Sequence, residues 1–462
     1  MTIRVVNADC LEALKGLDDC SVDAVITDPP YGLSNTKPAQ VADVLAAWVT
    51  GDTEAVPAKK GGFMGKDWDS FVPPPAVWAE CMRVLKPGGH MAVFAGARTQ
   101  DLMGLSIRLA GFEIRDTLGW VYGSGFPKSM DISKAIDKQK HKKDDTIRFT
   151  LWLREQCEVL GISKNDLDKA AGTSDMGGWW TSKLPHRCAI PTAEQWESIA
   201  RFFPALPDWA VPLIAPANQP GEAWEKREVV GVREVPQGHA FAGSTYGGDS
   251  SSKSVNVTAP ATSEAVRWDG WGTALKPAIE PIVLARKPLD GTVASNVLAH
   301  GVGGLNIDAS RVSSGEIASD GRWPANVLLD EYAAAEMDKQ SGNVNGVIGR
   351  SSELIKDSGG ASRFFPVFKY QTKAPKKERP AVEREDGTKI QHPTVKPLGL
   401  MEWLVTLITP PGGTVLDPFA GTGTTLQAAA QKGFNSIGIE QSAEYVELIS
   451  QRLADAGLKG AA

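Results

Sequence analysis

The residues best suited to chemistry near the start of the chain are Asp28, Pro29, Pro30 and Tyr31, which follow the apolar run 22–27. The β-branched residues of that run predict a buried strand, and the prolines end it because neither can donate to a sheet ladder. The resulting rigid corner presents a carboxylate, unpaired carbonyls and an aromatic ring. It can accept hydrogen bonds from an amino group while the ring stacks on a flat heterocycle. For these four residues alone, a strand-ending turn with an aspartate cap is the better prediction.

A second group of such residues lies near the end of the chain, where Asp417 precedes a turn that contains Gly421 and Gly423. Glycines between a strand and a helix let the backbone approach a ligand closely. The turn lacks the Gly-Lys-Thr/Ser of a phosphate-binding loop and the third glycine of a dinucleotide fingerprint. Instead, Glu440 ends the next predicted strand, where a carboxylate suits a ribose diol, and Asp417 suits a cationic amino-acid group. A nucleoside joined to an amino acid without phosphates describes S-adenosylmethionine.

These two groups, together with the stretch His392–Pro397, resemble the β class of S-adenosylmethionine-dependent DNA amino-methyltransferases of bacteria and phages. In that class the catalytic tetrapeptide lies far upstream of the glycine turn, which is a circularly permuted order. The resemblance covers residues 1–128 and 388–462 and, more weakly, 268–288. It implies an α/β fold with a Rossmann-like methyltransferase sheet.

The resemblance also implies how the cofactor is bound. Asp9, with Cys10 beside it, meets the adenine amino group, and Glu440 meets the ribose, although a helix cap stays an alternative role for Glu440. Thr394 and Lys396 are placed to meet the methionine carboxylate, and Lys396 supplies the positive charge. A surface lysine is nearly as good an interpretation of Lys396. The residues implied to line the methionine side are Asp417, Phe419, Gly421 and Gly423.

For catalysis the resemblance places Asp28, Pro29, Pro30 and Tyr31 around the methyl acceptor. Asp28 and the Pro29 carbonyl can accept both hydrogens of the target amine, which directs its lone pair at the methyl group. Tyr31 stacks on the base, which must leave the DNA helix to reach the pocket. Because the methyl group already sits on a sulfonium, these residues mainly need to align the reactants.

Aspartate at the first position of the tetrapeptide favours adenine N6 as the target, because cytosine-N4 enzymes more often carry serine there. Methylation of cytosine N4 is the close alternative. A DNA-binding regulator with a vestigial methyltransferase fold is a second class of function, and the intact carboxylates at Asp28 and Asp417 argue against it. Methylation of RNA or protein is a third, and the large insert and the motif order argue against it. We therefore expect a site-specific DNA methyltransferase.

The elements that position these residues follow from strand and helix signals that alternate towards both ends of the chain. At 462 residues the chain is long enough for two or three domains. Alternating strands and helices predict a mainly parallel sheet covered by helices. We expect a catalytic half at 1–128, a helical insert and linker at 129–267, a core strand segment at 268–288, a target-recognition region at 289–387 and a cofactor-binding half at 388–462.

Three segments between the motifs have their own signals. Residues 36–72 are polar and rich in glycine and lysine, and they predict a long mobile loop that acts as a lid. Residues 289–388 have little periodicity and predict irregular structure. Residues 147–203 contain four short helical patterns, with helix starts at Ser163 and Thr192, and predict a helix-turn-helix bundle that reads DNA. A small helical insertion packed by tryptophans is the alternative.

The net charge of −6 argues against a general nucleic-acid coat protein. Lysines nevertheless cluster at 128–143, and basic residues cluster at 363–379. Either cluster alone is weak evidence, because charge runs usually form solvated surfaces. Two local basic patches on an acidic protein do suit an enzyme that meets a polyanion on one face. The lysines expected to contact double-stranded DNA are Lys128, Lys142, Lys143, Lys183, Lys373 and Lys376.

The five cysteines form no Cys-x-x-Cys pair, so we expect reduced thiols and no metal site. No apolar run approaches the length that crosses a membrane, and the first residues are typical of a strand rather than a signal peptide. These features predict a cytoplasmic enzyme with no membrane partner. The resemblance is compatible with a homodimer, whereas the sequence identifies neither a restriction endonuclease partner nor the recognition site.

Overall fold

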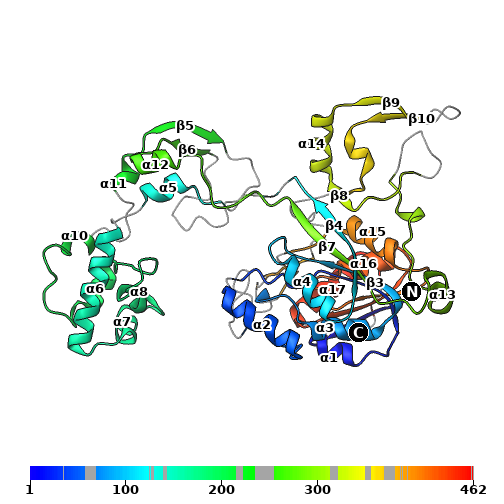
Figure 1. Cartoon of the computed structure of the whole chain (residues 1–462), viewed down its shortest axis with the longest axis horizontal. Coiled ribbons are helices and arrows are strands. Elements are labelled where there is room, and N and C mark those ends of the chain that lie inside the picture. The colour runs from blue at the N-terminus through cyan, green and yellow to red at the C-terminus, as the bar shows by residue number, and fades with distance from the viewer. Residues whose placement is uncertain are drawn as a thin grey trace. The chain divides into compact units, whose positions relative to one another are not determined.

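The computed structural model divides the chain into two compact units, drawn in Figure 1: Met1–Phe126 with Pro277–Ala462, and Pro127–Lys276. The expected segment 268–288 is therefore split, since its first part belongs to the second unit. The structure describes residues 1–34, 36–57, 69–123, 125, 129–138, 143–214, 222–234, 254–312, 321–348, 355–368, 380–384, 387, 389–392, 394–458 and 460.

The first unit is built on one large sheet. In the part of the chain that the structure describes, this sheet has nine strands in the order β1-β15-β14-β2-β3-β7-β4-β8-β11. β7 runs antiparallel to its neighbours β3 and β4, and the other pairs are parallel. The predicted α/β fold with a mainly parallel sheet is confirmed. The strands are β1 (Ile3–Asn7), β2 (Val22–Thr27), β3 (Leu85–Phe94), β4 (Glu113–Val121), β7 (Ile279–Arg286), β8 (Val327–Asp330), β11 (Val367–Phe368), β14 (Thr414–Asp417) and β15 (Asn435–Glu440).

Helices cover both faces of this sheet, because alternate residues of its central strands point to opposite sides. On β2, Val25 joins one core, while Ala24 and Ile26 join the other. Strands that are apolar on both faces are typical of parallel sheets covered by helices. The first core includes α1 (Cys10–Lys15), α2 (Pro38–Thr50), α3 (Pro75–Val84) and α4 (Gln100–Leu109), and the second includes α15 (Leu398–Ile408) and α16 (Thr424–Gln431).

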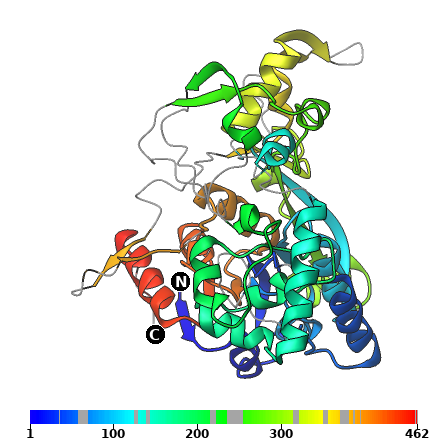
Figure 2. The same ribbon diagram turned by 90° about the vertical axis from the view of Figure 1, so that its left-hand side faces the viewer.

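The two ends of the chain lie side by side in the sheet. β1 pairs with β15 in the register Ile3 to Ser436, and β2 pairs with β14 in the register Val25 to Leu416. The last helix, α17 (Ala443–Asp455), contacts β1, and Figure 2 shows this helix beside the N-terminal end of the chain. The permuted order of the motifs therefore still produces one continuous sheet.

The prediction of a long loop over residues 36–72 was wrong, because α2 occupies part of this segment. Val44 and Trp48 on one face of α2 are buried against the first core. The Trp48 indole also donates to the Ala55 carbonyl at 2.8 Å. Burial of this small apolar face stabilises a helix in a segment that is otherwise polar. Residues 58–68 of the expected lid lie outside the described residues.

Residues 289–388, expected to be irregular, contain regular elements that extend the sheet. β8 pairs with β4, and β11 pairs with β8. Between them, α14 (Glu331–Ser341) is capped by the buried Asp330, whose carboxylate accepts from the backbone N–H groups of Gly123 and Ala333. Long-range pairing therefore orders a composition that predicts little by itself. The other elements beyond β7 are α13 (Val293–His300), η3 (Asp308–Ser310), β9 (Val344–Ile348), β10 (Ile355–Gly359), η4 (Ala361–Phe364), β12 (Val382–Glu383) and β13 (Lys389–Ile390).

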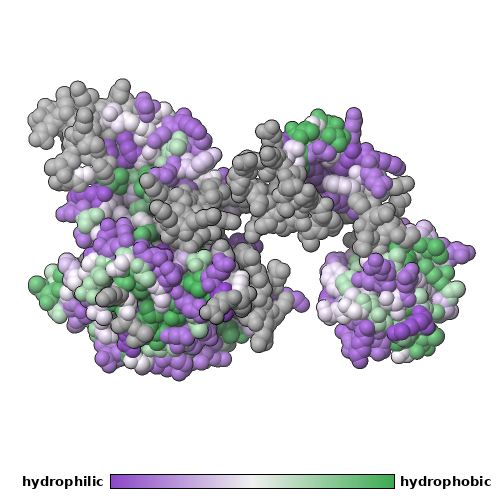
Figure 3. Space-filling view, turned by 180° about the vertical axis from the view of Figure 1, so that it is seen from behind, coloured by the Kyte–Doolittle hydropathy of each residue, from purple (hydrophilic) through white to green (hydrophobic). Residues whose placement is uncertain are grey.

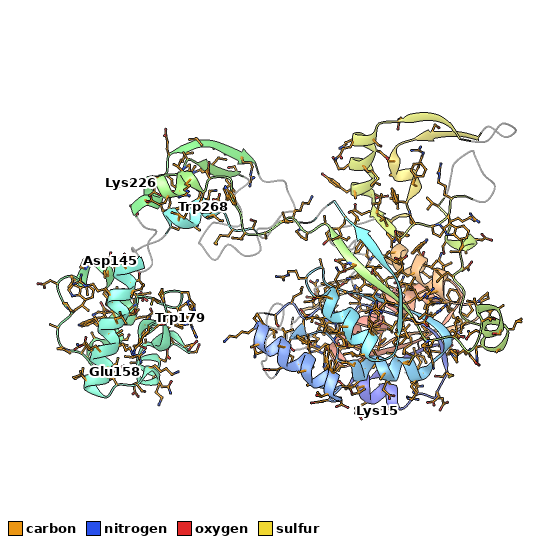
Figure 4. All side chains as sticks on the ribbon, in the orientation of Figure 1. Lys15, Asp145, Glu158, Trp179, Lys226 and Trp268 are labelled. Carbon is orange, nitrogen blue, oxygen red and sulfur yellow. The ribbon has the colours of Figure 1, made fainter. Side chains whose placement is uncertain are left out.

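One part of the second unit is a helical bundle, whose residues Glu158 and Trp179 are labelled in Figure 4. Buried aromatic and leucine side chains, including Trp180, form its core. The predicted helix starts at Ser163 and Thr192 are confirmed, since each forms a capping box with the residue three positions later. The helices are α6 (Lys143–Leu160), α7 (Lys164–Ala171), α8 (Met176–Trp180), α9 (Ala193–Ala200) and α10 (Val211–Ile214).

The second unit also contains short helices and a hairpin arranged around a buried ion pair. Arg227 contacts the Asp137 carboxylate, which also accepts from the Thr262 hydroxyl and the Ala261 N–H. The exposed valines of the hairpin form an apolar surface that is visible in Figure 3. Among the helices that the structure describes, none has both the length and the apolar character needed to cross a membrane. The elements of this part are α5 (Ile132–Asp137), α11 (Glu222–Glu225), α12 (Ser263–Arg267), β5 (Val229–Glu234) and β6 (Ser254–Thr258).

Candidate active site

A cavity of about 670 Å³ lies at the carboxyl ends of the parallel strands in the first unit. Asp9 follows β1, Asp28 follows β2, and Asp417 and Glu440 end β14 and β15. Ligands of open parallel sheets bind at this edge, where side chains from distant parts of the sequence converge. The predicted residues that line the cavity are Asp9, Cys10, Asp28, Pro29, Pro30, Tyr31, Thr394, Lys396, Asp417, Phe419, Gly421 and Glu440.

Asp417 links the two ends of the chain through its buried carboxylate. Its Oδ1 accepts from the Thr27 hydroxyl at 2.6 Å and from the Phe419 backbone N–H at 3.1 Å. Burial raises the pKa of Asp417 to about 6, although these hydrogen bonds and one from Thr425 oppose the shift. At neutral pH Asp417 is therefore mostly ionised, and within the described residues it forms no ion pair that would cancel its charge.

The glycine turn is tied to Glu440 by hydrogen bonds. The Gly421 N–H donates to Glu440 Oε2 at 2.8 Å, and the Ser442 N–H donates to Oε1 at 2.8 Å. Burial raises the pKa of Glu440, and these two hydrogen bonds oppose the rise. Glu440 thus lines the cavity and accepts from the Ser442 N–H just before α17, whose N-cap is Ser442 rather than Glu440.

Gly423 is the one predicted cofactor residue that is not among the described residues lining the cavity. It is the N-cap of α16 with φ +75°, in the left-handed region that favours glycine. A Cβ atom there would lie 3.0 Å from Ile449 Cγ2. Gly423 therefore serves the geometry of the turn, and its expected role in cofactor binding stays a prediction from the sequence.

Asp9 and Cys10 form the wall of the cavity at the start of α1. Asp9 caps this helix, because its Oδ1 accepts from the Leu11 N–H at 2.9 Å and the Glu12 N–H at 3.4 Å. Burial and the neighbouring Asp9 raise the pKa of the Cys10 thiol to about 12. Cys10 is therefore a neutral, weakly polar part of the wall at physiological pH.

At the other side of the cavity, the Lys396 ammonium contacts two carboxylates. Its Nζ lies 2.9 Å from Asp28 Oδ2 and 3.0 Å from Glu280 Oε2. It also donates to the Tyr31 hydroxyl at 3.0 Å. Burial acts to lower the pKa of Lys396, but the carboxylates of Asp28 and Glu280 outweigh burial and hold this pKa above its ordinary value. Lys396 is a buried cation, not the surface lysine that the sequence left as an alternative.

The corner at Asp28 and Tyr31 is held rigidly from several directions. Asp69 Oδ1 accepts from the Tyr31 N–H at 2.8 Å, and the Thr99 hydroxyl donates to the Tyr31 carbonyl at 2.6 Å. The Tyr31 hydroxyl lies 3.3 Å from Glu280 Oε2. Among the described residues, the other oxygen of Asp28, Oδ1, is buried and has no hydrogen-bond partner. A buried carboxylate oxygen without a partner is rare in proteins, and a functional role as an acceptor is one explanation for it.

Sequence reasoning missed several side chains that line this cavity. Glu280 is an acidic residue at the start of a strand whose middle is apolar, and this position is a signal that could have identified it. His392 belongs to the stretch His392–Pro397, on which the family resemblance partly rests. Its ring packs edge-on against the Tyr445 ring, with 4.6 Å between the two ring centres. Thr394, which was predicted, donates its N–H to His392 Nδ1 at 3.3 Å. No local pattern marks Asp69, which lies in the supposed lid.

The lysines expected to contact DNA fall mostly outside the described residues. This holds for Lys128, Lys142, Lys373 and Lys376, and for Lys143 the structure describes only the backbone at the start of α6. Lys183 is exposed in the loop that follows α8. The location of the others therefore stays a prediction from the sequence.

Comparison with known families assigns the class of protein. A family described as DNA methylase, which covers N6 and N4 enzymes, matches residues 22–206 and 218–451. The match extends over most of the chain and includes both the corner at Asp28 and the turn at Gly421. This protein therefore belongs to the N6/N4 DNA methylase family, whose members are S-adenosylmethionine-dependent DNA amino-methyltransferases.

Individual relatives match over shorter stretches. The chain is 44 % identical over 73 residues to the type II methyltransferase M2.MboI of Moraxella bovis, a match that covers 16 % of this chain and 27 % of that protein. It is 28 % identical over 190 residues to M.HindIII of Haemophilus influenzae, which covers 40 % of this chain and 44 % of that protein. The chain thus spans less than half the length of these relatives. A putative DNA modification methylase from Thermus thermophilus, in complex with S-adenosyl-L-methionine, superposes with a TM-score of 0.36 at 14 % identity, covering 100 % of both chains.

Proposed function

We propose that this protein transfers a methyl group from S-adenosylmethionine to the N6 amino group of a flipped-out adenine in DNA. The observation that carries the proposal is the pairing of two features in one cavity. Asp28 presents a buried acceptor without a partner among the described residues, and the charged carboxylates of Asp417 and Glu440 lie at the glycine turn of the same cavity. The Asp28 oxygen suits the hydrogens of an amine, and the two carboxylates suit a cationic nucleoside.

The residues of the cavity fit S-adenosylmethionine in charge and shape. The cofactor carries positive charge on its sulfonium and amino groups, and Asp417 and Glu440 supply negative charge. Backbone with a positive φ at Gly421 leaves room for close approach of a ligand. Asp9 lies beyond Glu440 at the end of β1, where the acidic side chain can accept from an amino group of the adenine ring. We assign Thr394 and Phe419 to the methionine side of the cofactor.

Bound S-adenosylmethionine supplies a methyl group whose carbon bonds to the amino nitrogen as its bond to sulfur breaks, with the electron pair leaving on sulfur. Asp28 Oδ1 and the Pro29 carbonyl accept the two N–H groups, which directs the nitrogen lone pair outward. This interaction strengthens as positive charge develops on the nitrogen. The methylated nitrogen then loses one proton along its hydrogen bond to Asp28 and on to water. Tyr31, fixed at its hydroxyl by Lys396, stacks on the base.

Sequencing of DNA from cells that express the protein, with detection of modified bases, tests this proposal. We expect N6-methyladenine at one short sequence, and no such mark in cells that express Asp28→Ala. Detection of N4-methylcytosine would mean that the target base is cytosine, whereas the proposed mechanism of methyl transfer would stand. Absence of any modified base with the wild-type protein would contradict the proposed activity.

We also propose that the pair α7–α8 in the second unit contacts the target DNA as a helix-turn-helix. The turn between the helices uses Gly172 with φ +67°. Asp168 of α7 holds α8 by accepting from the Thr173 hydroxyl and from the Gly177 N–H at 2.9 Å. A side chain at Gly177 would meet the Lys164 carbonyl at 2.3 Å, so the two helices pack closely. Such closely packed pairs place one helix for groove recognition.

The variant Lys183→Glu tests this second part, because Lys183 is exposed directly after α8. We expect weaker DNA binding and a salt dependence reduced by about one counterion, as for loss of one phosphate contact. Cofactor binding should be unchanged. Lys432→Glu is the matched control, since Lys432 lies in the first unit outside the residues that line the cavity. Equal DNA affinity of both variants and wild type would leave the bundle without a DNA-binding role.

A further inference from the structure

The ammonium of Lys396 is fully occupied by protein groups. An ammonium has three hydrogens to donate. Asp28 Oδ2 at 2.9 Å, Glu280 Oε2 at 3.0 Å and the Tyr31 hydroxyl at 3.0 Å account for all three. Its Nζ also lies 4.8 Å from the ring centre of Phe94 and 5.3 Å from the ring centre of Tyr31. A ligand carboxylate would therefore have to displace one of these partners before it could bind Lys396.

We propose that Lys396 and Glu280 act as positioning residues for Asp28 and Tyr31, and not as binding residues for the cofactor carboxylate. The inference rests on the proposed methyl transfer. Lys396 holds one oxygen of Asp28, which leaves the buried Oδ1 as the acceptor for the target amine. Glu280 holds the ammonium on the Oδ2 side, because it accepts from Lys396 and also from the Tyr31 hydroxyl at 3.3 Å.

Charge supports the same assignment. The groups that face Asp28 are the Lys396 cation, the neutral Tyr31 hydroxyl and the carboxylates of Glu280 and Asp417. Without Lys396, the carboxylates of Asp28 and Glu280 would lie near each other with no cation between them, and their like charges would repel. Lys396 therefore offsets this repulsion and also orients Asp28.

The position of Glu280 explains why two residues are needed. Glu280 lies near the start of β7, the antiparallel strand between β3 and β4, whereas Lys396 precedes α15. An ammonium paired with Asp28 alone is free to swing towards either carboxylate oxygen. With Glu280 as a second anchor the ammonium has one favoured place, and both Asp28 and the Tyr31 ring take their orientation from it.

The variants Lys396→Met and Lys396→Arg test the inference. For Lys396→Met we expect kcat for DNA methylation to fall about 100-fold, as for misplacement of a reacting group. The Kd for S-adenosylmethionine, measured by calorimetry, should change less than about threefold. Lys396→Arg should recover part of the rate, and Lys432→Met is the matched control that should match wild type.

The isosteric change Glu280→Gln gives an independent readout if Lys396→Met does not fold, which a melting curve would reveal. We expect kcat to fall about tenfold with an unchanged Kd for S-adenosylmethionine, since one of two anchors of the ammonium is weakened. A Kd raised tenfold or more by Lys396→Met, with kcat retained, would overturn the inference in favour of carboxylate binding. Wild-type rates in Glu280→Gln would overturn the role of Glu280. Failure of the wild-type protein to methylate DNA would instead contradict the proposed function itself.

Discussion

The carboxylates at the two ends of the cavity have different kinds of bonding partners. At the glycine turn, Asp417 and Glu440 are held by hydroxyl and backbone N–H groups, and in the described residues no cation contacts them. At the corner, Asp28 shares a buried lysine with Glu280. The first arrangement leaves negative charge to attract a cation. The second fixes the direction of one carboxylate and moderates its charge.

This difference matches the two partners of a methyl transfer. A cationic methyl donor gains from uncancelled negative charge near its sulfonium and amino group. A neutral amine gains little from net charge but needs an acceptor oxygen in a fixed position. Hydrogen bonds from backbone N–H groups can hold a carboxylate without removing its charge, and a lysine can hold it while offsetting the charge. Each end therefore uses the kind of support that its proposed ligand requires.

The largest effect is expected from Asp28→Ala, which removes the acceptor oxygen at the corner. Methylation should fall roughly 100- to 1000-fold, as for loss of an acceptor or donor aimed at developing charge. Binding of S-adenosylmethionine should persist, because Asp28 belongs to the other end of the cavity. Tritium transfer from labelled cofactor to DNA measures methylation, and calorimetry measures the binding of S-adenosylmethionine. Retained turnover would mean that Asp28 has no role in the mechanism. The proposed functional difference between the two ends of the cavity would then not hold.

A smaller effect is expected from Asp417→Asn at the glycine turn. It keeps the shape of the side chain and removes the charge. Charged hydrogen bonds are worth about 1.5–3 kcal/mol, so the Kd for S-adenosylmethionine should rise roughly 10- to 100-fold. Residual turnover at saturating cofactor should remain within about tenfold of wild type, since the corner is intact. Equal affinity of variant and wild type would mean that Asp417 only supports the turn.

The pH dependence of cofactor binding follows from the same residue. The pKa of Asp417 is raised by burial from 3.8 to about 6, so the folded protein takes up this proton as the pH falls through about 6. The negative charge is then lost, and affinity for a cationic ligand should fall about tenfold per pH unit below that value. The Asp417→Asn variant should bind weakly without this step. A wild-type Kd that stays constant between pH 7.5 and about pH 5 would contradict the assignment.

The smallest effect is expected from Cys10→Ala. Burial and Asp9 raise the pKa of the Cys10 thiol to about 12, so the wall at this point is uncharged. Removal of a neutral thiol at the cavity wall should change the Kd for S-adenosylmethionine less than about threefold. Exposed Cys20 should react with iodoacetamide at pH 8 much faster than Cys10. A large loss of affinity would show that this wall makes a specific contact.

Sequence patterns were sufficient where the physical cause is local. The helix starts at Ser163 and Thr192 depend on side chains within three residues, and both are present in the structure. The strand at 22–27 depends on a short β-branched run before two prolines. The helix α2 was missed because its stability comes from burying Val44 and Trp48 against distant residues. Glycine spacing also did not indicate that Gly421 lines the cavity while Gly423 packs near Ile449.

The sequence by itself determined that a carboxylate corner and a glycine turn exist, and that parallel strands would bring Asp28 and Asp417 to one edge. The reason is that a strand and the residues that end it are neighbours in the sequence, so a short local pattern predicts both. Only the tertiary structure decided which groups meet Lys396. Glu280 reaches it from an antiparallel strand placed between two others, and this pairing depends on the whole sheet. Long-range packing therefore places Lys396 against Asp28 and Glu280, a contact that its position in the sequence did not indicate.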